Sequence, residues 1–265
     1  MRTPPNVTEI LPALQPLKDR PKEAGLFLDL DGTLCDLVDL PEEVRFRQAT
    51  RNLLQDLRIR YNSVVVISGR SCRSLEAIIR LPELTYVGNH GLEIVEDGDR
   101  RVLLPEPHTS RMRAIEEMLP GAIDVEGAAL ELKELSHAIH YRRSPDPQVA
   151  RRDILEALGR LNLPDVHMLE GKFLIQIRPD AGLDKGTAVT TLVQERGIRF
   201  LLYAGDDTTD IDGFRAVKDL SAQSDGVGIR LAVSYRDTPA ALLGAADFSV
   251  PGVEGMSAVL GWMAS

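Results

Sequence analysis

The chain has 265 residues, 43% of them apolar, and a formal net charge of −9. This length and composition suit an ordinary globular protein with one large domain, or with a core and a smaller partner. Because the overall field is negative, neither nucleic acid nor an anionic membrane is expected as a partner, and an anionic ligand would need a local basic patch.

Features of a secreted or membrane-bound protein are not expected. The two cysteines, Cys35 and Cys72, cannot build a disulfide framework. The first residues lack a basic segment followed by a long apolar one, and no apolar run approaches the roughly 20 residues of a membrane helix. We therefore expect a cytoplasmic location, while the sequence leaves the oligomeric state open.

The first part of the chain alternates short apolar runs with helical patterns. We interpret residues 1–22, which are Pro-rich and polar, as a lead-in arm. Residues 26–30 predict a buried strand that ends at an Asp-Gly-Thr turn. Residues 63–67, rich in β-branched side chains, predict a second buried strand that ends at Ser68. A helical stretch separates these strands, and a further helix and strand follow.

The middle of the chain, residues 104–181, has a different pattern of apolar and polar residues. Its pattern predicts the order helix, two strands, helix, two strands, with elements at 110–119, 130–133, 138–142, from 147, and within 167–178. This αββαββ order predicts a small α+β domain inserted into the remainder of the chain.

The last part returns to the first pattern. Residues 185–196 predict a helix with Asp184 as its N-cap, and residues 200–204 and 227–233 predict two more buried strands. Short apolar strands that alternate with helices favour a parallel sheet covered on both faces.

The expected fold class is therefore α/β. A Rossmann-like core of residues 1–103 and 182–265 would carry residues 104–181 as the inserted α+β domain. Ligands of such sheets bind outside the carboxyl ends of the strands. Three predicted strands end in polar, small or acidic residues, so we expect the functional site at that edge.

Two carboxylates, Asp29 and Asp31, follow the first buried strand at a spacing of two. At this spacing they start on the same side of the chain, so one can attack phosphorus while the other transfers protons. Gly32 permits a tight turn, and Thr33 offers a hydroxyl and a backbone N–H. Considered alone, the pair is equally well explained as a turn cap without a metal.

Further carboxylates, Asp206, Asp207 and Asp210, follow the predicted strand at 200–204. They repel one another unless a cation lies among them. Hard oxygen ligands without His or Cys favour Mg²⁺ over Zn²⁺. The alternative is an acidic helix start that the helix dipole stabilises, which suits Asp210 in particular.

Candidate phosphate ligands stand at two more places. Ser68, Gly69 and Arg70 offer a hydroxyl and backbone N–H groups that can bind phosphate oxygens, although a plain strand-to-helix turn is the alternative. Lys185 opens a helix, where the dipole disfavours a cation. A bound anion would resolve that conflict, and a solvated surface lysine is the alternative.

The four motifs D-x-D-G-T, S-G-R, K-G and G-D-D-x-x-D occur in an order that resembles the haloacid dehalogenase superfamily of phosphohydrolases. The resemblance implies that Asp29 is the nucleophile and Asp31 the general acid and base, with Ser68 and Lys185 stabilising the phosphoryl group. It also implies a Mg²⁺ ion held by Asp29, the backbone carbonyl of Asp31 and Asp206, with Asp207 and Asp210 completing the acidic motif.

Finer motifs are similar to the trehalose-6-phosphate phosphatase family, in which an inserted type-2 cap (C2B) occupies the position of residues 104–181. The matching stretches are Leu28–Leu34, Val66–Arg70, Gly88–Glu93, Glu131-x-Lys133, His140–Arg142, Glu170–Lys172, Ile177–Pro179 and Gly205–Asp210. The resemblance implies that Glu131, Lys133 and Glu170 bind sugar hydroxyls. An exposed ion pair is the alternative for the first two.

The same resemblance completes the predicted substrate site. Asn89 is a candidate sugar contact, whereas His140 is expected to be structural. The local basic patch would comprise Lys133, Arg142, Lys172 and Arg178, and the phosphate contacts would include Thr33, Gly69 and Arg70.

Two positions depart from the family pattern, because Ile211 and Gln176 stand where Glu is usual. The expected substrate is trehalose 6-phosphate. The alternatives are another sugar phosphate, such as sucrose phosphate, a glycosyl-3-phosphoglycerate or a hexose phosphate, and a sensor without catalytic activity.

Overall fold

The computed structural model describes residues 5–38, 43–171, 173–223 and 225–265. The chain forms two compact units, Met1–Arg101 with Asp184–Ser265, and Val102–Leu183. Within the described ranges, no helix combines the length and the apolar character that a membrane span requires.

The first unit is built on a sheet in the order β12-β11-β10-β1-β2-β3-β4-β5. Neighbouring strands from β12 to β3 are parallel, and β4 pairs antiparallel with β3. The strands are β1 (Ala24–Asp29), β2 (Ser63–Ile67), β3 (Thr85–Gly88), β4 (Glu93–Glu96), β5 (Asp99–Val102), β10 (Phe200–Gly205), β11 (Val227–Ser234) and β12 (Phe248–Pro251).

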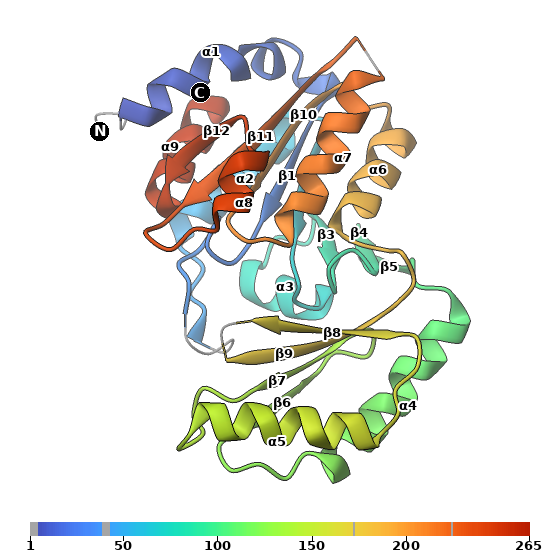
Figure 1. Cartoon of the computed structure of the whole chain (residues 1–265). Coiled ribbons are helices and arrows are strands. Elements are labelled where there is room, and N and C mark those ends of the chain that lie inside the picture. The colour runs from blue at the N-terminus through green and yellow to red at the C-terminus, as the bar shows by residue number, and fades with distance from the viewer. Residues whose placement is uncertain (1–4, 39–42, 172, 224) are drawn as a thin grey trace. The chain divides into compact units, whose positions relative to one another are not determined.

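Helices cover both faces of this sheet, as Figure 1 shows. Side chains of α1 (Pro5–Asp19), α2 (Gln48–Arg60), α3 (Cys72–Ile79) and α9 (Gly252–Ala264) share one buried cluster with Leu26 and Leu28. The other face carries α6 (Lys185–Arg196) and α7 (Asp210–Ala222), and α8 (Ala240–Ala245) follows β11. Alternate residues of β1 point to opposite faces of the sheet. Because helices cover both faces, β1 is apolar up to its last residue rather than alternating between apolar and polar residues.

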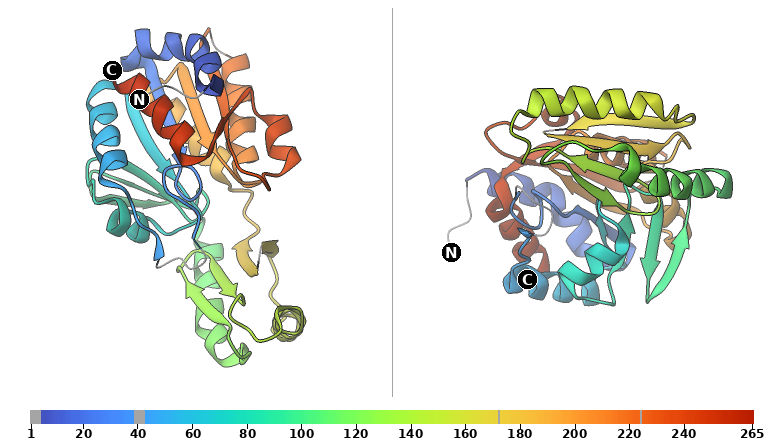
Figure 2. Two further views of the ribbon diagram at one scale, coloured as in Figure 1. Left: turned by 90° about the vertical axis from the view of Figure 1, so that its left-hand side faces the viewer. Right: turned by 90° about the horizontal axis from the view of Figure 1, so that it is seen from below.

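The prediction of a lead-in arm over residues 1–22 is wrong for the described residues. Residues 5–19 form α1, and 21–23 a 3₁₀ turn. Val7, Ile10, Leu14 and Leu17 recur at helical spacing and are fully buried. Their burial outweighs the hydrogen bonds that the internal Pro12 and Pro16 remove. The helix lies against α9 (Figure 2), where Lys18 Nζ donates to the Trp262 carbonyl at 2.8 Å.

The second unit is an antiparallel sheet in the order β6-β7-β9-β8 with two helices. Its elements are α4 (Glu106–Ala122), β6 (Ala129–Leu132), β7 (His137–His140), α5 (Pro147–Arg160), β8 (Val166–Gly171) and β9 (Leu174–Pro179). Ile139, Ile175 and Ile177 are buried. By strand register they share a face with His137, whose Nε2 contacts the Met112 carbonyl of α4, so this is the face that carries the helices. This αββαββ unit and the parallel core confirm the predicted fold class.

Candidate active site

Acidic and polar side chains meet at the carboxyl edge of three neighbouring strands. Asp29 is the last residue of β1, Ser68 follows β2, and Asp206 follows β10. Because β1 pairs in parallel with both β2 and β10, these residues come to one edge of the sheet. Carboxylate oxygens of Asp29, Asp206 and Asp210 lie within 4.8 Å of one another.

Lys185 links the carboxylates of this cluster. Its Nζ donates to Asp29 Oδ1 and to Asp210 Oδ1, both at 2.7 Å, and its side chain is only 3% exposed. Asp184 caps the helix in front of it, since its Oδ1 accepts from the Thr187 N–H at 2.8 Å. The unfavourable cation at this helix start is therefore stabilised by two carboxylates of the protein itself.

Asp210 is saturated with hydrogen-bond donors. Its Oδ1 accepts from Lys185 and from the Tyr203 hydroxyl at 2.9 Å, and its Oδ2 accepts from the backbone N–H groups of Asp206 and Asp207, both at 3.1 Å. A carboxylate with four donors has little capacity left for a metal. Its contacts instead hold Lys185 and the Asp206 backbone in place.

The cluster carries more negative charge than its single ammonium can neutralise. Burial raises the pKa of Asp29 well above its usual range, with Lys185 opposing and Asp210 and Asp206 adding to the rise. Burial and then Asp210 raise the pKa of Asp206 to about 8. Burial alone would lower the pKa of Lys185, but Asp210 and Asp29 outweigh it and raise the pKa. The carboxylates of Asp29 and Asp206 beside this ammonium offer hard oxygen ligands that fit a divalent cation such as Mg²⁺.

These shifts predict how stability depends on pH without divalent cations. A carboxyl whose folded-state pKa is raised contributes stability below its usual pKa, and this contribution is lost as pH rises through the folded-state value, which is about 8 for Asp206. We expect the melting temperature of the metal-free protein to fall between about pH 5 and about pH 8, and Mg²⁺ to raise it more at the higher pH. Thermal unfolding with a chelator or with Mg²⁺ measures both. In Asp206→Asn the melting temperature should fall less steeply as pH rises. An unchanged pH dependence would contradict the raised pKa assigned to Asp206.

Asp31 and Asp207 lie outside the cluster. The Asp31 carboxylate accepts two hydrogen bonds from Arg70, from Nε at 2.7 Å and from Nη2 at 2.9 Å. Asp207 is exposed, and its Oδ1 accepts from the N–H of Thr208 at 2.7 Å. Of the five predicted metal ligands, the structure therefore brings together the side chains of Asp29, Asp206 and Asp210.

The turn after β1 is packed tightly against Asp206. Gly32 has a φ of +79°, and a Cβ placed there would lie 2.1 Å from Asp206 Oδ2, so the position requires glycine. Thr33 is fully buried, and its hydroxyl has no hydrogen-bond partner among the described residues. A phosphate contact for Thr33 stays a prediction.

The segment after β2 packs against the turn that follows β3. Ser68 Oγ accepts from the Arg70 N–H at 3.2 Å, and the Asn89 N–H donates to the Arg70 carbonyl at 2.7 Å. A Cβ at Gly69 would meet the His90 ring at 2.5 Å. Asn89 is fully buried, which supports a structural role, so its predicted sugar contact stays a prediction.

Behind this segment, Glu93 is a buried carboxylate that organises its surroundings. Its Oε1 accepts from Asn89 Nδ2 at 2.7 Å and from the Cys72 N–H at 2.8 Å, and its Oε2 pairs with Arg100 Nε at 2.6 Å. It therefore fixes the start of α3 and the turn after β3 together. The only signal in the sequence was its place in the Gly88–Glu93 stretch.

In the second unit, the predicted sugar ligands divide between two faces of the sheet. Glu131 Oε2 contacts His140 Nε2 at 3.1 Å and Lys133 Nζ at 3.8 Å. By strand register Glu131 shares its face with Ala138 and Gln176, opposite to the helices. Glu170 instead faces Ile175 across the β8–β9 pair and accepts from Arg151 Nη2 of α5 at 2.7 Å. The register therefore separates Glu170 from Glu131.

The predicted basic patch lies only partly within the described residues. The guanidinium of Arg142 lies 5.0 Å from the centre of the Phe173 ring, a cation–π contact. Lys172 lies outside the described residues.

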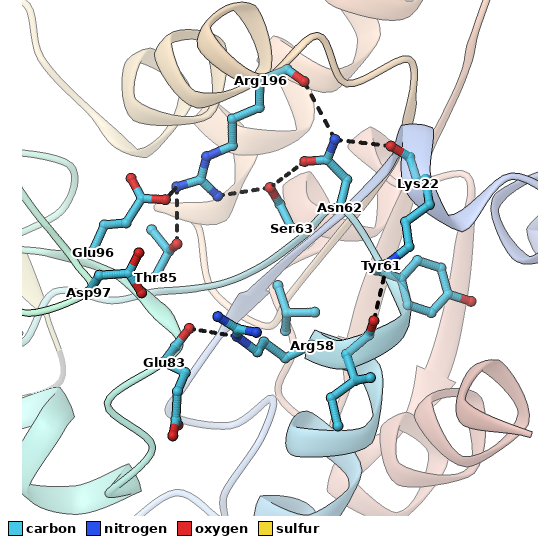
Figure 3. Close-up of a pocket in the computed structure, with 12 residues that line it drawn as sticks. Lys22, Arg58, Tyr61, Asn62, Ser63, Glu83, Thr85, Glu96, Asp97 and Arg196 are labelled. Atoms are coloured by element: carbon cyan, nitrogen blue, oxygen red, sulfur yellow. Dashed lines mark hydrogen bonds and ion pairs between the residues drawn. The ribbon is translucent and has the colours of Figure 1, made fainter.

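A polar cleft of about 420 Å³ lies at the opposite end of the core strands (Figure 3). Ser63 and Thr85, which begin β2 and β3, are among its lining residues. Arg196 donates to both of their hydroxyls, at 2.8 and 3.0 Å, and to Glu96 at 2.7 Å. These side chains satisfy one another at the amino ends of the strands, far from Asp29 at the carboxyl end of β1.

A parallel sheet with this set of motifs at its carboxyl edge, and an α+β insertion, defines a fold of the haloacid dehalogenase type. The sequence matches the trehalose-phosphatase family over residues 27–239. The chain belongs to this family, which confirms the resemblance seen in the motifs.

Individual relatives agree with the family match. The chain is 29% identical to a probable trehalose-phosphate phosphatase E of Arabidopsis thaliana, covering 84% of this chain and 66% of the relative. It is 30% identical to a probable trehalose-phosphate phosphatase 2 of Oryza sativa subsp. japonica, covering 83% and 64%. The chain thus spans slightly less than two thirds of these relatives.

Among solved structures, the C-terminal domain of the trehalose-6-phosphate phosphatase of C. albicans superposes with a TM-score of 0.76 at 22% identity, covering 100% of this chain and 99% of that one. At this identity the likeness shows the fold alone.

Proposed function

We propose that this chain is a Mg²⁺-dependent phosphatase that hydrolyses trehalose 6-phosphate to trehalose and phosphate through a phospho-aspartate on Asp29. The observation that carries the proposal is the buried contact of the Asp29 carboxylate with Lys185 Nζ, at 2.7 Å, beside Asp206. This arrangement combines a nucleophile, a fixed positive charge and a further hard oxygen ligand. Family membership and the curated relatives favour trehalose 6-phosphate as the sugar phosphate.

The proposed chemistry assigns one role to each residue. Asp29 attacks phosphorus and receives the phosphoryl group, while Asp31 donates a proton to the departing sugar oxygen. Asp31 then takes a proton from the water that hydrolyses phospho-Asp29. Lys185 keeps its positive charge beside Asp29 during both steps. The Ser68 hydroxyl donates a hydrogen bond to a phosphoryl oxygen.

The carboxylates of Asp29 and Asp206 and the backbone carbonyl of Asp31 would hold Mg²⁺. The bound ion supplies fixed positive charge to the phosphoryl oxygens. Asp210 already accepts four hydrogen bonds and is proposed to act by positioning Lys185 and the Asp206 backbone.

Phosphate release from a panel of sugar phosphates tests the proposal. We expect release from trehalose 6-phosphate with Mg²⁺, and a strong loss of rate in chelator. A clear preference for sucrose phosphate, a glycosyl-3-phosphoglycerate or a hexose phosphate would contradict the substrate. If no phosphate is released from any of these substrates, with or without Mg²⁺, the alternative of a sugar-phosphate sensor without catalytic activity would be favoured.

The second unit is proposed to contribute sugar recognition through Glu131 and Lys133. Replacing Glu131 by Ala removes a carboxylate acceptor for sugar hydroxyls, so we expect kcat/KM for trehalose 6-phosphate to fall by about 10- to 100-fold, as for loss of a charged hydrogen bond. Turnover of a small aryl phosphate should change little.

A matched control is Glu156→Ala, which removes an exposed carboxylate on α5 that pairs with Arg160. This variant should leave both substrates unaffected. Equal losses on both substrates in Glu131→Ala would argue against sugar recognition by Glu131. The variant Glu170→Ala then asks whether that residue, paired with Arg151 on the other face, contributes at all.

A further inference from the structure

Tyr235 lies at the carboxyl edge of the core sheet but belongs to none of the predicted motifs. It follows the last residue of β11, and its backbone is fixed by a local turn, because its N–H donates to Thr238 Oγ1 at 2.6 Å. The ring packs beside Gly252, where an added Cβ would lie 3.5 Å from it. These contacts therefore fix the position and direction of the Tyr235 side chain.

The hydroxyl of Tyr235 donates to the carbonyl of Gly32 at 2.6 Å. Burial, followed by the nearby carboxylate of Asp206, raises the pKa of Tyr235 to about 12, so the hydroxyl keeps its proton at physiological pH. The contact joins residues 203 positions apart in the sequence.

Gly32 is consequently held at both ends. Its N–H donates to the Cys35 carbonyl at 2.8 Å, and its carbonyl accepts from Tyr235. It also lies directly against the Asp206 carboxylate, since an added Cβ would lie 2.1 Å from Asp206 Oδ2. Gly32, one residue after the Asp31 backbone carbonyl, is therefore the point at which Tyr235 and the Asp206 carboxylate meet the turn.

We propose that Tyr235 is a positioning residue for the divalent cation, because its hydroxyl fixes the carbonyl of Gly32, the residue that joins the Asp31 carbonyl to the Asp206 carboxylate, and with it the spacing between those two groups. This inference rests on the proposed function, which assigns these two groups to the metal. Tyr235 itself touches neither the ion nor the substrate. Its loss should therefore weaken cation binding without removing a reacting group.

The test compares Tyr235→Phe with Tyr86→Phe in the full chain. Tyr86 is a matched control, because its buried hydroxyl also donates to a backbone carbonyl, that of Leu81 at 2.7 Å, away from the acidic cluster. Mn²⁺ serves as the probe, and free Mn²⁺ is counted by electron paramagnetic resonance. We expect Tyr235→Phe to bind Mn²⁺ about 3- to 10-fold more weakly than wild type, as for loss of one hydrogen bond, with wild-type affinity in Tyr86→Phe.

Steady-state kinetics give a second readout. In Tyr235→Phe the Mg²⁺ concentration for half-maximal rate should rise by a similar factor, while kcat at saturating Mg²⁺ stays within about twofold of wild type. Equal Mn²⁺ affinity in wild type and Tyr235→Phe would overturn the inference and leave the proposed function standing. A wild-type protein that binds no Mn²⁺ or Mg²⁺ would overturn both.

Discussion

Replacing Asp29 by Asn is expected to abolish phosphate release while the protein still folds. The amide has nearly the shape of the carboxylate but cannot attack phosphorus to form the acyl phosphate. Loss of a nucleophile commonly costs about 10⁴-fold or more in kcat.

The same substitution is expected to maintain or raise the melting temperature in the absence of metal. The pKa of Asp29 is raised by burial and by two neighbouring carboxylates, so the ionised side chain destabilises the folded state at neutral pH despite its contact with Lys185. An amide removes this repulsion. Functional residues often show this opposition between activity and stability.

Stopped assays of phosphate release and thermal unfolding in chelator measure the two effects of Asp29→Asn. The control is Asp36→Asn, which removes an exposed carboxylate that pairs with Arg47. This variant should retain activity and melting temperature. Substantial turnover by Asp29→Asn would exclude the phospho-aspartate route.

The parallel core was predictable because its strands are short continuous apolar runs that end in polar residues. The runs at 26–30, 63–67 and 200–204 correspond to β1, β2 and β10, and the site residues Asp29, Ser68 and Asp206 follow from where they end. The helix α1 was missed because its two prolines are ordinarily breakers. The strand β5 was missed because its sequence Asp-Arg-Arg-Val is exposed and carries no apolar alternation.

The supporting contacts of the site could not be predicted from spacing. Tyr203, Glu93 and Tyr235 act through hydrogen bonds whose partners depend on which strands become neighbours. The face occupied by Glu170 depends on strand register, and a shift of one residue reverses it. Residue types near strand ends therefore predict the reacting groups, while the residues that position them require the folded arrangement.

Replacing Lys185 by Met is expected to have the largest effect on stability. The ammonium is the buried cation between Asp29 and Asp210, and Met fills similar space without the charge. Removing one partner from a buried ion pair typically costs about 3–5 kcal/mol of the free energy of unfolding. Loss of charge stabilisation at the phosphoryl group should also lower kcat by about 10³-fold.

The pH dependence distinguishes lost charge from lost packing in Lys185→Met. Without the ammonium, the pKa values of Asp29 and Asp206, already raised by burial, rise further, so these groups bind protons in the folded state. Their protonation relieves the repulsion at low pH, and the destabilisation should therefore grow as pH rises from about 5 to about 8.

The double variant Lys185→Met/Asp29→Asn provides the decisive comparison. If unpaired carboxylates cause the loss, removing one of them should recover part of the stability, so the effects of the two substitutions should not add. The exposed Lys22, whose Nζ donates to the Ile59 carbonyl at 3.1 Å, gives the control Lys22→Met, which should change little. Denaturant unfolding at both pH values measures these differences. A loss in Lys185→Met that is independent of pH and unchanged by Asp29→Asn would show that Lys185 acts by packing, and the electrostatic account of the site would be wrong.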